Sequence, residues 1–198
     1  MRGALSLRTG EFQARYALVI DGESLYEVVW ELAGGAEVVV RPHGARGGHS
    51  GLDIHRPDNV NAIKVLSEID QQVPQGVVQR NERGVVTSLN AGLIEGGTAR
   101  NAIAPEARLT YLLRSTDPEE EKKVIERIRA TAAAAEKKHQ ALQPDFRVEV
   151  KVNSFLPPWK AATDSPLIQW VRKAGAKLGA KDIRPTSMHA GAESNIFA

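Results

Sequence analysis

The segment GVVTSLNAGLIEGGTARNAIAPEARLTYLLRS, residues 84–115, decides the fold that we expect for this chain. Its first and last parts are rich in apolar and β-branched residues, a composition typical of strands. Between them, Gly96, Gly97 and Pro105 mark a bend, because glycine and proline interrupt regular structure. We therefore predict two antiparallel strands that lie side by side.

The residues before this segment add a strand and a helix. AEVVVRP, residues 36–42, is rich in valine and reads as a strand. Residues 57–73 place apolar side chains three and four positions apart, which predicts a helix that ends at Pro74 and Gly76. Its predicted apolar face consists of Val60, Ile63, Leu66, Ile69 and Val73.

A second helix and a last strand follow. Residues 115–142 begin with a capping residue, a proline and three glutamates and end with lysines, an order that complements the helix dipole. Residues 146–152 alternate apolar and charged side chains, as a half-buried strand does. The order of elements predicts an α+β, ferredoxin-like domain over residues 35–156, with a four-stranded antiparallel sheet and both helices on one face. The apolar face of the second helix comprises Val124, Ile128, Ala132 and Ala135.

The two flanks differ from this central domain. RYALVID, residues 15–21, predicts a buried strand that presents Asp21 at its carboxyl end. Beyond residue 156 we expect a linker, a helix over 165–178, a short strand and a polar glycine loop at 189–195. Residues 1–34 and 157–198 therefore read as pieces of an α/β catalytic layer, neither with a sheet of its own.

Composition narrows the classes of function. A net charge of +2 gives no field that would attract nucleic acid or an anionic membrane, and no apolar run is long enough to span a bilayer. We expect a soluble, cytoplasmic chain. Because the chain has no cysteine, a metal would need histidine and carboxylate ligands.

Four polar residues stand in positions where they could bind a metal ion or a substrate, and for each of them a purely structural role is the alternative. Asp21 at a strand end is a candidate metal ligand or a turn cap. His49, in GGHSG, is a candidate donor to an oxyanion or a solvent-facing loop residue. Asn101 is a candidate for binding a substrate main chain or a turn residue. Arg114 is a candidate for binding a carboxylate or a partner of Glu119–Glu121.

Taken together, these segments resemble the dizinc exopeptidases, the family of peptidase T, aminoacyl-histidine dipeptidase, glutamate carboxypeptidase and aminoacylase. The similarity lies in YALVIDGE, in GGHSGLDIH, in EGGTARNAIAPEARLTYLLRS and in HAGAESNIF, and it follows the order of the family along nearly the whole chain. The resemblance implies a catalytic α/β domain that binds two zinc ions. It also implies an inserted ferredoxin-like lid that forms a homodimer.

The same resemblance implies a role for each candidate residue. Asp21 would bind one zinc ion, and His49 would reach the active site of the partner and stabilise the tetrahedral oxyanion. Asn101 and Arg114 would bind the main chain and the carboxylate of a short peptide substrate. Gly191 would line the pocket from the catalytic side.

Other family residues have no counterpart in this chain, namely the first zinc histidine, the bridging aspartate, the Glu-Glu pair that contains the general base, and the last histidine. We therefore expect a part of a dipeptidase or aminopeptidase that is inactive alone. A non-catalytic ferredoxin-like module that binds a small molecule or serves dimerisation is the alternative. RNA binding is less favoured, because the two central strands carry only Tyr111 as an aromatic residue.

Overall fold

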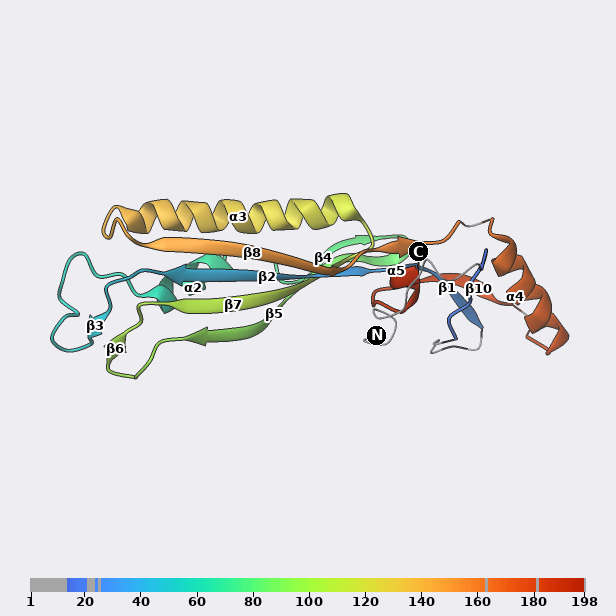
Figure 1. The fold of residues 1–198 in the computed structure, drawn as a ribbon, viewed down its shortest axis with the longest axis horizontal. Coiled ribbons are helices and arrows are strands. Elements are labelled where there is room, and N and C mark those ends of the chain that lie inside the picture. The colour runs from blue at the N-terminus through green and yellow to red at the C-terminus, as the bar shows by residue number, and fades with distance from the viewer. Residues whose placement is uncertain (1–13, 21–23, 25, 163, 181, 198) are drawn as a thin grey trace.

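The computed structural model describes residues 14–20, 24, 26–162, 164–180 and 182–197. A five-stranded sheet and a three-stranded sheet lie one after the other along an elongated molecule (Figure 1). The larger sheet is antiparallel throughout. Its strands, in spatial order, are β4 (Gly76–Asn81), β5 (Gly84–Gly96), β7 (Ala107–Ser115), β2 (Gly34–His43) and β8 (Arg147–Leu156).

The four expected strands β2, β5, β7 and β8 have the ferredoxin-like arrangement, so the predicted α+β fold is confirmed. The expected number of strands is wrong, because β4 adds a fifth strand outside β5. This strand was missed because it is short and has only two valines as a strand signal. It forms because a tight turn at Glu82 and Arg83 folds it back onto β5, which supplies its hydrogen-bond partners.

Two helices cover one face of the larger sheet. Helix α2 (Ala62–Asp70) is capped by Asn61, whose side chain accepts hydrogen bonds from two main-chain N–H groups, and α3 (Pro118–Gln140) is capped by Asp117 in the same way. The predicted face of α3 is fully confirmed, since all four of its residues are buried. Helix α2 is shorter than the predicted range 57–73: Leu66 and Ile69 are buried on it as predicted, Val60 and Val73 are buried but lie outside the helix, and Ile63 is 38% exposed.

The core between sheet and helices includes one polar anchor. Tyr111 of β7 is completely buried, and its hydroxyl donates a hydrogen bond of 2.8 Å to Oδ1 of Asp70 at the end of α2. Burial, followed by the Asp70 carboxylate, raises the pKa of Tyr111. The hydroxyl therefore stays a donor at all physiological pH values and fixes the end of α2 over the sheet.

An ion-pair network joins the two helices at their exposed side. Glu68 of α2 lies 2.6 Å from Nζ of Lys138 and 3.1 Å from Nε2 of His139, both on α3. The Lys138 hydrogen bond, followed by the His139 bond, holds the pKa of Glu68 below its ordinary value. The stabilisation by this carboxylate is therefore present above the ordinary carboxyl pKa and is lost as the pH falls through the lowered value.

We expect Glu68→Gln to lower the free energy of unfolding by about 0.5–1 kcal/mol at neutral pH, since the pair is partly exposed. In acid the difference from the wild type should vanish, because the wild-type carboxylate is then protonated. Urea unfolding of this chain at both pH values measures the effect. Glu126→Gln, at an exposed position of α3, is the matched control. A difference that persists in acid would contradict the assignment.

The two flanks together form the three-stranded sheet, and neither of them has a sheet of its own within the described residues. Strand β1 (Glu27–Leu32) pairs in parallel with β10 (Arg184–Met188) and antiparallel with β9 (Trp159–Lys160). The pairing joins residues more than 120 positions apart along the chain, as the register of Glu27 with Arg184 shows, so no local pattern predicts it. The predicted strand over residues 15–20 is wrong, since the structure has no strand there and Ile20 is 93% exposed.

The chain crosses between the two sheets twice, through very short connections. Ala33 alone separates β1 from β2, and Pro157 and Pro158 separate β8 from β9. Helix α4 (Pro166–Lys177), within the predicted range, and the short α5 (Ser194–Phe197) complete the smaller part. Within the described residues, no helix combines the length and the apolar character that a membrane crossing requires.

Candidate functional site

His49 and Asn101 lie together at the far end of the five-stranded sheet. His49 belongs to a two-residue strand, β3 (Gly48–His49), which pairs with β6 (Ala102–Ile103). The N–H of Ser50 donates a hydrogen bond of 2.9 Å to the carbonyl oxygen of Asn101. Residues more than 50 positions apart are thus joined into one projecting element, labelled β3 and β6 in Figure 1.

The ring of His49 has a defined hydrogen-bonding pattern. Its Nδ1 accepts hydrogen bonds from the main-chain N–H groups of Gly51 (3.1 Å) and Leu52 (3.2 Å). Since Nδ1 is the acceptor, the neutral ring carries its proton on Nε2. The residue is exposed, so this N–H is available to a ligand outside the chain. The arrangement suits a hydrogen-bond donor to a developing negative charge.

Arg114 lies at the other end of β7, where the two sheets meet. It stands opposite Gly35 on β2 and Ser88 on β5, and it is half-buried. Within the described part of the chain it forms no ion pair, so the simpler explanation as a partner of Glu119–Glu121 is not supported. A half-buried guanidinium with no acid paired to it among the described residues has the chemistry that suits two-point binding of a carboxylate.

His189, in the loop after β10, adjoins Arg114. Its Nε2 lies 2.7 Å from Oγ of Ser88, so this hydrogen bond links the loop to the larger sheet. Burial, and then the Arg114 guanidinium, lower the pKa of His189, while the Val85 main chain acts in the opposite direction. The imidazole is therefore neutral at physiological pH and adds no charge beside Arg114.

Gly191 and Asn195 anchor this loop to both crossings between the sheets. A side chain at Gly191 would place its Cβ 2.1 Å from Cδ2 of Leu156, so glycine permits the close approach. The buried amide of Asn195 donates to the carbonyl oxygens of Ala33 (3.3 Å) and Pro157 (2.8 Å). The sequence singled out the loop but not Asn195, because only the fold reveals that its amide lies between two distant carbonyl groups.

The structure therefore brings the candidates together as two groups and not as one. His49 and Asn101 lie beyond the start of β7, and Arg114 lies near its end, beside the loop that contains Gly191. Strands rise by about 3.3 Å per residue, so roughly 25 Å of strand separates the groups. Side chains do not reach across that distance, and one copy of the chain cannot apply both groups to one small ligand.

The predicted metal ligand Asp21 lies outside the described residues. Across the described ranges, no group of three or more histidine, cysteine, aspartate and glutamate side chains is placed to hold a metal ion.

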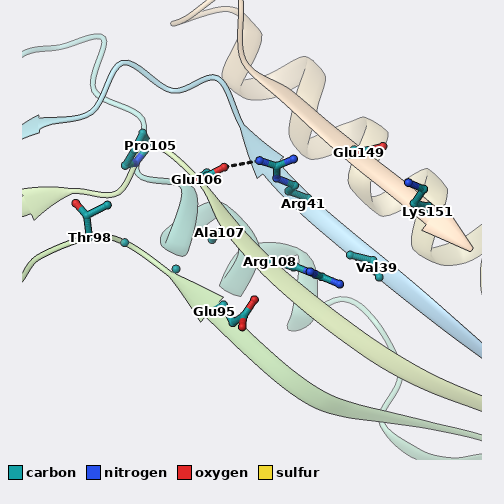
Figure 2. Close-up of a pocket in the computed structure, with 12 residues that line it drawn as sticks. Val39, Arg41, Glu95, Thr98, Pro105, Glu106, Ala107, Arg108, Glu149 and Lys151 are labelled. Atoms are coloured by element: carbon teal, nitrogen blue, oxygen red, sulfur yellow. Dashed lines mark hydrogen bonds and ion pairs between the residues drawn. The ribbon is translucent and has the colours of Figure 1, made fainter.

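A hollow of about 470 Å³ lies on the sheet face opposite the helices, beside the His49 end (Figure 2). Its cations and carboxylates are equal in number, and Arg41 pairs with Glu106 at 2.6 Å. This balance favours neither an anion nor a cation, so we assign no catalytic group to the hollow. Its charged lining consists of Arg41, Glu95, Glu106, Arg108, Glu149 and Lys151.

The chain thus combines a ferredoxin-like domain, with a projecting histidine at one end, and two short crossings to a second sheet at the other end. The chain belongs to the M20 peptidase dimerisation-domain family, whose model matches residues 34–140. The predicted resemblance to this group of peptidases is thereby confirmed.

Several known proteins are similar to this chain in sequence or in fold. The chain is 25% identical over 153 residues to the uncharacterized protein YqjE of Bacillus subtilis, covering 76% of this chain and 37% of that protein. Aminopeptidase PepT from Bacillus cereus has the same fold, with a TM-score of 0.81 at 22% identity, covering 99% of this chain and 49% of PepT. The YXEP protein of Bacillus subtilis, a dinuclear metal-binding M20 peptidase, matches with a TM-score of 0.58 at 15% identity, over 85% and 38% of the two chains. The chain thus spans half or less of each.

Proposed function

We propose that this chain is part of a zinc-dependent metallopeptidase, of the dipeptidase or aminopeptidase type, that hydrolyses short peptides. The observation that carries the proposal is the separation of the two groups along the length of β7. His49 and Asn101 are exposed beyond one end of this strand, and Arg114 and Gly191 lie near the other end, beside the smaller sheet. Two copies that exchange their projecting ends would complete two identical sites.

Each residue then has one role in peptide hydrolysis. Arg114 binds the substrate carboxylate, Asn101 binds the main chain, and Gly191 lines the catalytic side. The Nε2–H of the partner's His49 donates to the oxygen that becomes negatively charged when the carbonyl is attacked. Two zinc ions, when bound, would lower the pKa of a water molecule and so make it a nucleophile at neutral pH. Asp21 is proposed as one ligand, and the others come from the remainder of the catalytic domain.

The smaller sheet supports a longer catalytic domain. Two mainly apolar grooves of about 240 and 260 Å³ lie along β1, and Leu18, Ile20 and Trp170 beside them are more than half exposed. Such surfaces are usually covered in a complete protein. We propose that the remaining catalytic layer covers them, that residues 1–34 and 157–198 belong to it, and that residues 35–156 form the lid. The chain alone then does not hydrolyse peptides.

The dimer is proposed to form through the free part of β5. Strand β4 pairs only with the first part of β5, up to Leu89, so residues 90–96 have an unpaired edge within the described part of the sheet. Leu93 and Ile94 on this edge are 68% and 67% exposed, and Ile63 of α2 lies beside Gly96 at the end of the edge. A second copy related by a two-fold axis would pair with this edge and cover the isoleucines.

We expect Ile94→Lys to convert the dimer into a monomer, raising the dissociation constant roughly 100-fold or more, since two symmetric copies each lose an apolar contact of about 1.5 kcal/mol or more. Sedimentation velocity over a range of concentrations measures the change. Leu178→Lys, at an 88% exposed position after α4, is the matched control and should remain dimeric. Equal dimerisation of both variants would exclude this edge.

The experiment that tests the proposed function combines His49 and Arg114 variants of the longer hydrolase in one dimer. If the two groups serve one site across the dimer, the variants complement one another. If His49→Ala leaves the activity of the intact hydrolase unchanged, the proposed role of His49 is wrong.

A further inference from the structure

Two residues to which no role has been assigned, Asp53 and Arg56, bind the main chain of the loop that contains His49. The N–H of His49 donates a 2.7 Å hydrogen bond to Oδ2 of Asp53, and the N–H of Asp53 donates a 2.9 Å bond to the His49 carbonyl oxygen. These reciprocal bonds close the turn from 49 to 53. The same turn directs the N–H groups of Gly51 and Leu52 at the His49 ring.

Arg56 ties this turn to the strand before it. Its Nη2 lies 3.1 Å from Oδ1 of Asp53 and donates a 3.2 Å hydrogen bond to the carbonyl oxygen of Gly47. One guanidinium thus bridges the two sides of the turn. Both side chains are about one-third exposed, so water screens the ion pair only in part.

Gly48 is the residue that admits this pair. A Cβ at Gly48 would lie 2.6 Å from Nη2 of Arg56 and 2.8 Å from Oδ2 of Asp53, and its φ of +147° disfavours other residues. The ion pair of Asp53 and Arg56, which packs against Gly48, therefore explains the second glycine of GGHSG. The interactions of this pair hold the loop in a defined conformation.

We propose that Asp53 and Arg56 are positioning residues for His49. They hold the turn in the one conformation that presents two N–H groups to Nδ1, and so they keep the ring proton on the outward Nε2. Without the carboxylate, the His49 N–H loses its acceptor, the Arg56 bridge is broken, and the ring is free to rotate. The consequence for catalysis rests on the proposed function of His49, but the effect on the ring does not.

The first test uses this chain alone. Long-range proton–nitrogen NMR of the His49 ring in slightly alkaline buffer reports which nitrogen carries the proton, and amide exchange reports the Gly51 and Leu52 bonds. We expect a single Nε2–H tautomer in the wild type. In Asp53→Ala we expect a mixture of tautomers and at least about tenfold faster exchange of both amides. Asp53→Asn, which keeps an acceptor for His49 but loses the ion pair, should lie between them.

Two further variants complete this test. Asp182→Ala removes a similar aspartate–arginine pair, with 2.7 Å between Asp182 and Arg184, far from the loop, and should leave the His49 spectrum unchanged. Arg56→Ala should reproduce the direction of the Asp53→Ala effect. An unchanged tautomer and unchanged amide exchange in both loop variants would overturn the proposal.

The second test uses the longer hydrolase. Asp53→Ala should lower kcat by about tenfold or more with a smaller change in KM, because a misplaced donor weakens the transition state more than the bound substrate. In a His49→Ala background the same change should have no further effect on kcat. Equal effects in both backgrounds would show that Asp53 does not act through His49. If His49→Ala itself has no effect, the proposed function fails, while the NMR result still decides the positioning role.

Discussion

At substrate concentrations well below KM, a mixture of the His49→Ala and Arg114→Ala variants of the intact hydrolase should recover about a quarter of the wild-type activity, although each variant alone has lost nearly all of it. Random pairing makes half of the dimers mixed. In a mixed dimer one site receives His49 from one copy and Arg114 from the other, and the second site lacks both. Removing a single oxyanion donor typically lowers kcat by roughly 100-fold to 1000-fold, so the recovered activity will be well above the background.

The measurement is peptide hydrolysis by the two variants co-expressed with different affinity tags, first as the mixture and then after purification through both tags. Purification leaves only mixed dimers with one complete site of two, so the activity should then rise to about half of the wild-type value. His49→Ala combined with Asn101→Ala is the control, because these residues lie on the same projecting element, as the bond from Ser50 to Asn101 shows. That pair should not complement. Failure of the His49 and Arg114 pair to recover activity would contradict the proposed dimeric arrangement.

Arg114→Ala should lower kcat/KM for peptides with a free terminal carboxylate by roughly 30-fold, since a hydrogen bond to a charged group contributes about 2 kcal/mol. The loss should appear mainly in KM, because the carboxylate is bound in the ground state and in the transition state alike. Arg114→Lys should restore little, since an ammonium does not reproduce the two-point geometry of a guanidinium.

Substrates with an amidated terminus provide the decisive comparison, because they offer Arg114 no carboxylate. For them the Arg114→Ala variant and the wild type should differ much less. Arg108→Ala, an exposed arginine at the opposite end of the same strand, should affect neither class of substrate. An equal loss on both classes would show that Arg114 supports the fold of the site and does not bind the carboxylate.

The local patterns in the sequence were sufficient for most of the central domain. The spacing of Val124, Ile128, Ala132 and Ala135 identified the buried face of α3 correctly, because helix periodicity is a property of neighbouring residues. The bend around Gly96 and Gly97 correctly predicted that β5 and β7 pair. Strand β4 escaped prediction because its stability comes from pairing with β5, which no local pattern records.

The candidate site likewise divides into residues that the sequence identified and contacts that only the structure shows. His49, Asn101 and Arg114 were selected because of their residue types beside glycines and strand ends, and the structure shows that each occupies an accessible or half-buried position. The network of Asn195, Ala33 and Pro157 was not foreseeable, since it joins three segments separated by more than 30 residues. Asp53 and Arg56 lie within the quoted GGHSGLDIH segment or directly after it, yet only their distances to Gly47 and His49 reveal what they do.

By itself, the sequence of this protein determined the order of four strands and two helices in the ferredoxin-like domain, most of the faces that the helices bury and the residue types available for chemistry. These properties depend on periodicity, capping and turn residues that act over a few positions. Only the tertiary structure decided that the candidates form two groups at opposite ends of β7 and that distant flanks share one sheet. Distances of this kind arise from strand pairing between remote segments, and that pairing is set by the packing of the whole chain.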